Sequence, residues 1–453
     1  MGLAARMESP ISALAPRVLV AFHDFPENGG ARIDKFVQLL PRAGLEPVVL
    51  TAAENATPES RELLRQGYPP ELEVHWASSM AFAPFTPRYL VRARGARFYQ
   101  LLRLLSAPER FAFIPDHMVR WIPAAIPIAR RLAKSGRIDC VFTSSPPEST
   151  HLIGLYLQRA WGIPWVADFQ DLWTEKGFLC RPVTRLHAAA IRRLESSIFR
   201  AADHIIANTP ENRNRHLNRF ALAPNRVTVI PNGFDRSDLE SGQHPVQRDG
   251  VFRIGYMGHF DKHGFPWRHF LVALKALADE VGSHSVRLIH CGFRSTEVER
   301  YIAANGLTDL VEWRGNLSHR AALNCIASTD LLLNLLYENE YSDSIVNAKL
   351  YPYLILNRPI LAVGPRLGAM ARIVEETRTG TVVSAAGGPG TILAALRHHR
   401  AAWIMGNNHL APDEGQVARY DCVQQTKALA AILWRYSRRT VGTEAAALAV
   451  GNA

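Results

Sequence analysis

Four short segments of this chain gather residues that could bind an anion or a sugar. The first, residues 341–349, carries Asp343, Ser344 and Lys349 before an apolar stretch with helical periodicity. Hydroxyls, backbone N–H groups at a helix start and an ammonium group all favour an anion such as a diphosphate. Plain capping of the helix by the same residues is the alternative that the sequence leaves open.

The second segment, residues 255–264, follows a predicted strand and reads Gly-Tyr-Met-Gly-His-Phe-Asp-Lys-His-Gly. Gly258 allows the backbone to approach a ligand closely, and His259 and Lys262 can meet a diphosphate. The alternative is a turn whose basic side chains are simply solvated.

The third segment, residues 23–30, ends Asn-Gly-Gly between the first predicted strand and the first predicted helix. Gly29 and Gly30 let backbone N–H groups approach a ligand phosphate or sugar. The spacing is not GxGxxG, which disfavours dinucleotide binding. A simple turn between strand and helix is the alternative.

Acidic and aromatic residues mark the fourth segment, residues 168–175. Asp168 and Asp171 follow a predicted strand, at the edge where open α/β sheets bind their ligands. We predict both carboxylates as catalytic residues, and Trp173 could stack on the face of an acceptor sugar. A helix N-cap at Asp168 or Asp171 is the competing interpretation.

The elements around these segments alternate between strand and helix. Buried runs predict strands at 17–22, 46–50, 138–143, 164–168, 204–207, 227–230, 252–256, 286–290, 311–313, 330–335, 360–363 and 380–383. Helical periodicity lies between many of them, at 31–43, 149–161 and 185–200, and again at 423–436. This alternation predicts an α/β protein with two Rossmann-like, doubly wound parallel sheets.

The length of 453 residues is too great for one ordinary domain and suggests two of about 200 residues each. We place an N-terminal lead-in at 1–16, the first Rossmann-like domain at 17–235, a polar linker at 236–250 and the second domain at 251–420. The helix and tail at 421–453 follow, and we consider that this helix packs back on the first domain.

The net charge and the cysteine content limit the possible functions of the protein. The net charge of +11 favours anionic partners, although a basic protein without such a partner remains an alternative. Five dispersed cysteines without a CxxC pair argue against a disulfide framework and a zinc site, and favour reduced thiols in the cytoplasm. We predict no signal peptide and no membrane-spanning helix.

A basic and aromatic segment, residues 88–105, suits the surface of an anionic membrane. A solvated pair of helices packed on the first domain is the alternative. Nucleic-acid binding is disfavoured, because the basic residues do not gather around stacking aromatics on one motif.

Six stretches, in this order and spacing, resemble glycosyltransferase family 4, in particular enzymes of bacterial surface-polysaccharide assembly. They are residues 113–123, 143–148, 163–173, 202–209, 230–235 and 347–361. The resemblance implies the GT-B architecture, in which two facing Rossmann-like domains enclose an interdomain cleft. It implies that the first domain binds a glycan or lipid-linked acceptor, with His117 and Trp173 on the acceptor side, and that the second binds a nucleotide-sugar donor.

The resemblance further implies transfer with retention at the anomeric carbon, without a metal or another cofactor, by a cytoplasmic protein peripheral to the inner face of the cell membrane. The implied donor-binding residues are Gly29, Gly30, Gly258, His259, Lys262, Asp343, Ser344 and Lys349. The chain departs from the family at Pro352, where a glutamate is usual, and neither carboxylate of the family's paired motif is in register. A GT-B sugar-nucleotide epimerase or hydrolase, and a catalytically degenerate GT-B scaffold, therefore stay open.

Overall fold

The computed structural model describes residues 15–26, 32–79, 113–175, 184–239, 249–262, 264–406 and 411–438. The chain divides into two compact units, which are described separately below. Unit 1 comprises Met1–Asn208, Arg213–Ile230 and Thr426–Ala453, and unit 2 comprises Thr209–Asn212 and Pro231–Gln425. Gly29, Gly30 and the basic segment 88–105 lie outside the described residues.

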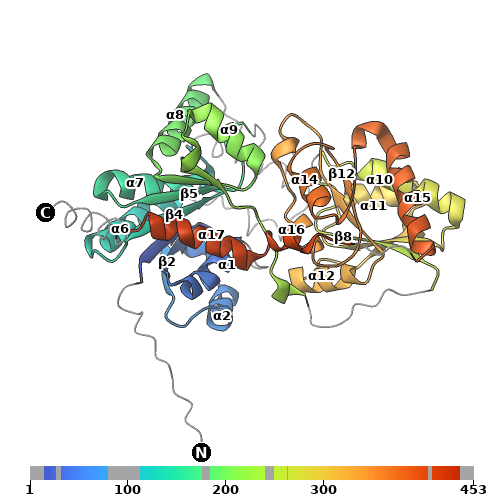
Figure 1. Cartoon of the computed structure of the whole chain (residues 1–453), viewed down its shortest axis with the longest axis horizontal. Coiled ribbons are helices and arrows are strands. Elements are labelled where there is room, and N and C mark those ends of the chain that lie inside the picture. The colour runs from blue at the N-terminus through green and yellow to red at the C-terminus, as the bar shows by residue number, and fades with distance from the viewer. Residues whose placement is uncertain are drawn as a thin grey trace, which may run out of the picture. The chain divides into compact units, whose positions relative to one another are not determined.

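The described part of unit 1 is built on a seven-stranded parallel sheet in the order β3-β2-β1-β4-β5-β6-β7 (Figure 1). The strands are β1 Arg17–Ala21, β2 Glu46–Ala52, β3 Glu73–Ala77, β4 Cys140–Ser145, β5 Trp165–Phe169, β6 His204–Ala207 and β7 Val227–Val229. The strand order reverses between β1 and β4. Such sheets bind ligands at the carboxyl ends of the strands on either side of that reversal.

Helices cover both faces of this sheet. Alternate residues of each strand point to opposite sides, so the apolar side chains on each side need a cover of helices. Leu19 and Ala21 of β1 pack with α6, α7 and α8, whereas Val18 and Val20 pack with α1 and α17. The helices are α1 Arg32–Leu39, η1 Leu40–Ala43, η2 Ala53–Asn55, α2 Pro58–Gly67, η3 His117–Trp121, α6 Ile122–Lys134, η4 Glu148–Thr150, α7 His151–Trp161, α8 Arg185–Ala201, α9 Pro210–Phe220, η5 Pro224–Arg226 and α17 Cys422–Arg435.

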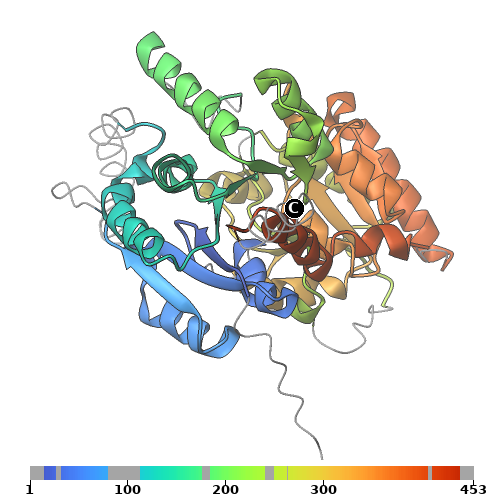
Figure 2. The same cartoon turned by 60° about the vertical axis from the view of Figure 1, so that its left-hand side comes forward.

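The last described helix, α17, joins the core of unit 1 with its second half. Leu429 and Leu433 lie in the same buried cluster as the residues of β1 and α1. The Trp434 indole N–H donates to the carbonyl oxygen of Ala43 at 3.1 Å. Figures 1 and 2 both show the red helix α17 beside the blue elements of unit 1.

Unit 2 repeats the plan with a sheet of six parallel strands, within the described residues, in the order β10-β9-β8-β11-β12-β13. The strands are β8 Phe252–Met257, β9 Val286–Cys291, β10 Val311–Trp313, β11 Leu331–Leu335, β12 Ile360–Val363 and β13 Gly380–Val383. Here the order reverses between β8 and β11. The residues that follow these two strands are therefore the ones best placed to bind a ligand.

The helices of unit 2 cover its sheet on both sides, which explains why the central strands β8, β11 and β12 are almost entirely buried. They are η6 Arg236–Asp238, α10 Trp267–Val281, α11 Thr296–Ala304, η7 Thr308–Leu310, α12 His319–Ala327, η8 Ser342–Ser344, α13 Leu350–Tyr353, α14 Ala369–Glu376, η9 Ala385–Gly387, α15 Gly388–Ile404 and α16 Glu414–Ala418. Ser295 and Ser318 cap α11 and α12 by accepting backbone N–H groups, as expected of serine at this position.

The predicted fold class, an α/β protein with two Rossmann-like parallel sheets, is confirmed. The sequence analysis did not predict strand β3, which reads Glu-Val-His-Trp-Ala. This strand lies at the edge of the sheet, and four of its five residues are only half-buried. An edge strand of this composition lacks the continuous apolar run that marks the central strands.

Candidate functional site

Lys349, one of the two lysines predicted to bind a diphosphate, lies at the reversal point of the unit 2 sheet, within the electrostatic reach of the other, Lys262. Gly258 directly follows β8 with a φ of 95°, a conformation that glycine adopts readily. The Lys349 Nζ atom would lie 3.4 Å from a Cβ atom placed on Gly258, so the ammonium sits directly over this turn. The structure thus brings together Gly258 and Lys349, two of the residues predicted to bind the donor.

The Lys349 ammonium occupies a largely apolar setting. It lies 3.8 Å from the ring centroid of Tyr256 and 6.0 Å from that of Phe265. Burial, with a smaller contribution from the positive charge of Lys262, holds the pKa of Lys349 well below its usual range. A bound anion would remove this penalty, because it favours the charged form of the lysine.

Backbone contacts fix the turn beneath the ammonium. The Gly258 N–H donates to the carbonyl oxygen of Cys291 at 2.8 Å, and the Gly258 carbonyl oxygen is 2.9 Å from His290 Nε2. Burial lowers the pKa of His290 to about 4, so its ring is neutral and Nε2 is the donor to this carbonyl. Gly292 packs so closely on Gly258 that a Cβ atom there would lie 2.4 Å from the Gly258 oxygen.

Exposed aromatic rings lie next to this turn, after β9 and at the end of β10. Phe293 is 49% exposed and its ring is 5.0 Å from that of His259. Trp313 is 43% exposed, its indole N–H donates to the Gly292 carbonyl at 2.8 Å, and the Arg294 guanidinium lies 4.5 Å from its ring. Flat exposed rings beside a basic turn can stack with a planar base. The sequence analysis missed both rings, although Trp313 ends the predicted strand 311–313 and Phe293 lies three residues beyond the predicted strand 286–290.

The segment before Lys349 differs from the prediction. The expected helix is α13, which has only four residues, with Lys349 at its N-cap. Pro352 is tolerated in its first turn but has no N–H to donate, and the chain soon turns again at Asn357, whose φ is 52°. The Ser344 side chain is buried and donates to the Tyr341 carbonyl at 2.9 Å, and Asp343 is half-buried in η8. The basic side chains rather than a long helix dipole therefore dominate the local charge.

In unit 1, Asp168 is enclosed rather than exposed to a ligand. It lies within β5, is 0% exposed, and accepts hydrogen bonds from the Arg32 guanidinium at 3.1 and 3.2 Å. The Ser144 hydroxyl donates to the same carboxylate at 2.8 Å. A carboxylate inside a strand is not a helix N-cap. The hydrogen bonds of Asp168 position Arg32 and Ser144, and its side chain is not exposed for contact with a substrate.

The segment that carries Asp171 is anchored on both sides. Gln170 donates to the Ser144 hydroxyl at 3.1 Å, and the Thr174 hydroxyl donates to the buried Glu195 at 2.6 Å. Arg219 pairs with the same Glu195 at 2.8 Å. No helix begins within the described residues 171–175, so helix capping does not account for Asp171, which is half-buried.

The two predicted acceptor-side residues lie in different surroundings. Trp173 is 3% exposed and belongs to the core cluster of unit 1, so in this structure its ring packs inside rather than facing solvent. His117 is exposed at the start of η3, which Asp116 caps by accepting the Met118 N–H at 2.9 Å. Trp173 follows two carboxylates in the sequence, as a sugar-stacking ring would, but it is a core residue in the fold.

The sequence analysis included His23 in the third segment but gave its side chain no role; it follows β1 at the reversal point of the unit 1 sheet. Its ring is 2% exposed, with Nδ1 at 2.6 Å from Asp24 and Nε2 at 3.3 Å from Glu54. Burial alone would lower the pKa of His23, but the hydrogen bonds and charges of Asp24 and Glu54 outweigh it and raise the pKa to about 9.

This histidine should make the stability of the protein depend on pH. Because the folded protein holds the proton of His23 more tightly than the unfolded chain does, the protonated ring stabilises the fold. This stabilisation is complete below the ordinary pKa of 6.5 and is lost as the pH rises through 9. We expect the free energy of unfolding to fall by roughly 1–3 kcal/mol over this window, since the two carboxylates are partly exposed and screened. Denaturant unfolding of the wild type and of His23→Gln, with the exposed His284→Gln as control, measures the difference. An identical pH dependence for all three proteins would contradict the assignment.

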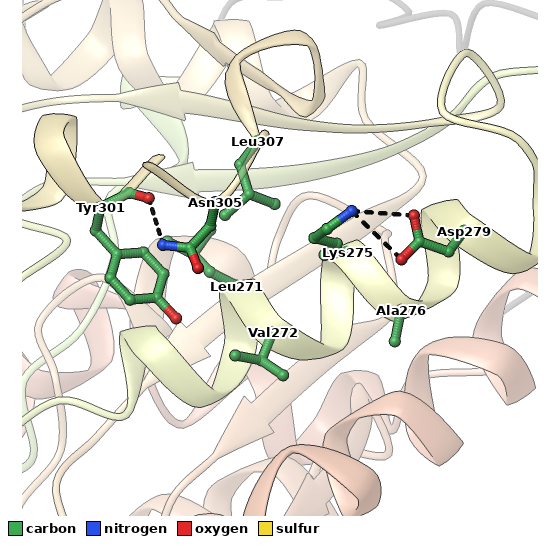
Figure 3. A pocket seen from close by; sticks show the side chains of 8 residues that line it. All are labelled: Leu271, Val272, Lys275, Ala276, Asp279, Tyr301, Asn305 and Leu307. Atoms are coloured by element: carbon green, nitrogen blue, oxygen red, sulfur yellow. Dashed lines mark hydrogen bonds and ion pairs between the residues drawn. The ribbon is translucent and has the colours of Figure 1, made fainter. Parts of the chain in front are cut away.

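Other features of the described residues do not point to a site. No group of three or more His, Cys, Asp or Glu side chains is placed there to hold a metal ion, and none of the described helices has the length and hydropathy to cross a bilayer. A shallow groove of about 300 Å³ lies between α10 and the region of α11 (Figure 3). Its Lys275 is paired with Asp279 at 3.1 Å, and its Asn305 donates to the Tyr301 carbonyl at 2.8 Å.

Part of this chain is similar in sequence to known glycosyltransferases. Residues 29–233 match the family described as Glycosyl transferase 4-like domain. A 2-deoxystreptamine glucosyltransferase of Streptomyces kanamyceticus is 24% identical over an alignment of 254 residues, and the match covers 51% of this chain and 63% of the length of that relative.

Solved structures share the fold over nearly the whole chain. A glycosyltransferase from Rickettsia africae superposes with a TM-score of 0.59 at 11% identity, covering 93% of this chain and 99% of that one. Anabaena Alr3699/HepE, solved in complex with UDP and glucose, gives a TM-score of 0.52 at 14% identity, covering 96% and 99%. At such identities the likeness establishes the common GT-B fold.

Proposed function

We propose that this chain, a glycosyltransferase family 4-like protein with the GT-B fold, transfers a hexose from a nucleotide-sugar donor to a glycan or lipid-linked acceptor. The observation that carries the proposal is the Lys349 ammonium held over the Gly258 turn at the reversal point of the unit 2 sheet. A partly desolvated cation beside a tight glycine turn, with a second lysine nearby, is suited to a diphosphate.

The exposed rings beside this turn support a nucleotide rather than a simple phosphate. Phe293 and Trp313 offer apolar faces to a base, while Lys349 and Lys262 would neutralise the diphosphate. The relative solved with UDP and glucose is consistent with a nucleotide-sugar donor. With two lysines to bear the charge of the leaving diphosphate, the reaction would need no metal, and added chelator should leave the rate unchanged.

In the proposed reaction, unit 1 contributes the acceptor-binding residues. Asp171 would either orient the acceptor hydroxyl or stabilise positive charge at the anomeric carbon, and the network of Arg32, Asp168 and Ser144 would hold its segment in place. The departing phosphate would take the acceptor proton, with retention of configuration. The proposed setting is cell-surface polysaccharide assembly at the inner face of the cell membrane.

A thermal-shift screen of UDP-, GDP-, dTDP- and ADP-sugars tests the donor class. A ligand at 100 times its dissociation constant should stabilise the protein by about 2.7 kcal/mol. Release of nucleoside diphosphate with formation of a new glycosidic bond would then distinguish transfer from epimerisation or hydrolysis. The absence of a shift with every donor would favour a non-catalytic scaffold and contradict the proposal.

A further inference from the structure

A buried asparagine interrupts the apolar strand β11, next to the reversal point of the unit 2 sheet. The strand reads Leu-Leu-Leu-Asn-Leu, and Asn334 is 0% exposed. Burying an amide is costly unless hydrogen bonds replace those that it made with water. The Asn334 Nδ2 donates to Met370 Sδ at 3.1 Å, and its Oδ1 accepts the Asn347 Nδ2 at 3.3 Å. A leucine would pack here without that cost, so the asparagine indicates a role other than core packing.

The partner, Asn347, joins the chain before Lys349 to the end of β11. Its Nδ2 also donates to the carbonyl oxygen of Leu335, the last residue of the strand. Its own carbonyl oxygen accepts the Leu350 N–H at 2.9 Å, which closes a turn around Lys349. We call the pair of Asn334 and Asn347 the β11 anchor.

A further hydrogen bond joins the other end of α13 to the neighbouring strand. The Tyr353 hydroxyl, on a side chain that is 1% exposed, accepts the Met257 N–H at 3.1 Å. Met257 is the last residue of β8 and directly precedes Gly258. We call this contact the β8 anchor. It holds α13 to the strand whose following turn lies beneath the Lys349 ammonium.

The helix α13 needs such anchors because it is short. It has four residues, about one turn, and a single turn is unstable by itself because few hydrogen bonds offset the entropy of ordering it. Its placement, and that of Lys349 at its N-cap, therefore depends on tertiary contacts. Asn347 and Tyr353 flank Lys349 in the sequence, and they reach the two strands on either side of the reversal.

We propose that the two anchors hold Lys349 over the Gly258 turn, in place for the diphosphate of the donor. Asn334, Asn347 and Tyr353 are then positioning residues, which act through Lys349 and need not touch the nucleotide. The inference rests on the proposed function, since it concerns the same site. Loss of either anchor should weaken binding of a nucleoside diphosphate about 3- to 10-fold, but less than about 2-fold in a protein that already lacks the Lys349 charge.

The Asn334→Leu variant separates this role from a purely structural one. Leucine matches the rest of β11 and removes a buried amide, while Asn347 keeps its bond to the Leu335 carbonyl. The melting temperature should therefore stay the same or rise while nucleotide affinity falls. A purely structural role predicts unchanged affinity.

Two further variants complete the set. Tyr353→Phe removes only the hydroxyl and so tests the β8 anchor. Asn324→Ala is the matched control, because the Asn324 amide on α12 also donates to a backbone carbonyl, that of Arg320, at 2.8 Å.

Hydrogen exchange of the full chain without nucleotide tests the anchors themselves. Amides of peptides within residues 345–356 should exchange faster in Asn347→Ala and Tyr353→Phe than in the wild type, and at the wild-type rate in Asn324→Ala. Titration calorimetry then measures the affinity of each variant, with and without Lys349→Met, for the tightest binder among UDP, GDP, dTDP and ADP.

The outcomes separate this inference from the proposed function. Unchanged exchange in both anchor variants would overturn the inference, whatever the protein binds. Faster exchange with unchanged nucleotide affinity, or an equal loss of affinity with and without Lys349→Met, would overturn it as well. Equal affinity of Lys349→Met and the wild type would contradict the proposed diphosphate site and, with it, the role of the anchors. The exchange rates would distinguish that failure from a failure of the anchors themselves.

Discussion

Replacing Lys349 with alanine is expected to weaken binding of the nucleotide donor by roughly 1.5–3 kcal/mol, about 10- to 100-fold in affinity. The ammonium lies over the Tyr256 ring and the Gly258 turn, and the lysine is half-buried. A charged hydrogen bond to a diphosphate oxygen is worth more there than at an exposed position, because the low local dielectric strengthens it.

Titration calorimetry with the donor selected by the thermal-shift screen measures this loss. Lys349→Met is the more informative variant, since it keeps most of the apolar stem and removes the charge. Lys275→Ala is a matched control, because Lys275 is a lysine of the same unit that pairs with Asp279 on α10. Unchanged donor affinity in both Lys349 variants would show that the diphosphate is bound elsewhere.

The second large effect is expected from Asp171→Asn, which should lower turnover by about 100-fold or more while donor affinity stays nearly unchanged. The substitution keeps the size of the side chain and removes its charge. In either role, orienting the acceptor hydroxyl or stabilising positive charge at the anomeric carbon, Asp171 needs its negative charge. The neutral amide should therefore not stabilise the transition state. The donor contacts proposed above lie in unit 2, so binding of the donor should not depend on Asp171.

The competing structural role predicts a different pattern. If Asp171 served only to hold the local backbone, the variant should lose about 1 kcal/mol of stability and turn over normally. Melting temperature and the initial rate of nucleoside diphosphate release, measured on the same preparation, distinguish the two roles. Glu71→Gln is the control, because this exposed carboxylate of unit 1 precedes β3 and so lies toward the amino ends of the parallel strands.

The sequence predicted the central strands and the meeting of Gly258 with Lys349. Strands β8 and β11 are buried apolar runs, which mark strands covered on both faces. Gly258 directly follows β8, and Lys349 lies in the connection between β11 and β12, so both are in segments that leave the carboxyl ends of the strands at the reversal, where this fold class binds ligands. The distance of 3.4 Å from Lys349 Nζ to the Cβ position of Gly258 agrees with that logic.

Other features depend on contacts between residues far apart in the chain, which sequence patterns do not reveal. Asp168 looks like a catalytic carboxylate in its local sequence, but Arg32, 136 residues away, encloses it. The raised pKa of His23 comes from the adjacent Asp24 and, in addition, from the distant Glu54, on the η2 turn that follows the neighbouring strand. Trp173 is a core residue, in a buried cluster to which α8 also contributes, and α13 is short, with the chain turning soon after Pro352.

The central claim is that the turn after β8 and Lys349 bind the diphosphate of a nucleotide sugar. A crystal structure of the full chain with the nucleoside diphosphate that gives the largest thermal shift tests it most directly. The account predicts a phosphate oxygen within hydrogen-bonding distance of Lys349 Nζ, the phosphates against the Gly258 backbone, and the base toward Phe293 and Trp313. A nucleotide bound away from the β8–β11 reversal point, with no phosphate oxygen near Lys349 Nζ, would contradict it.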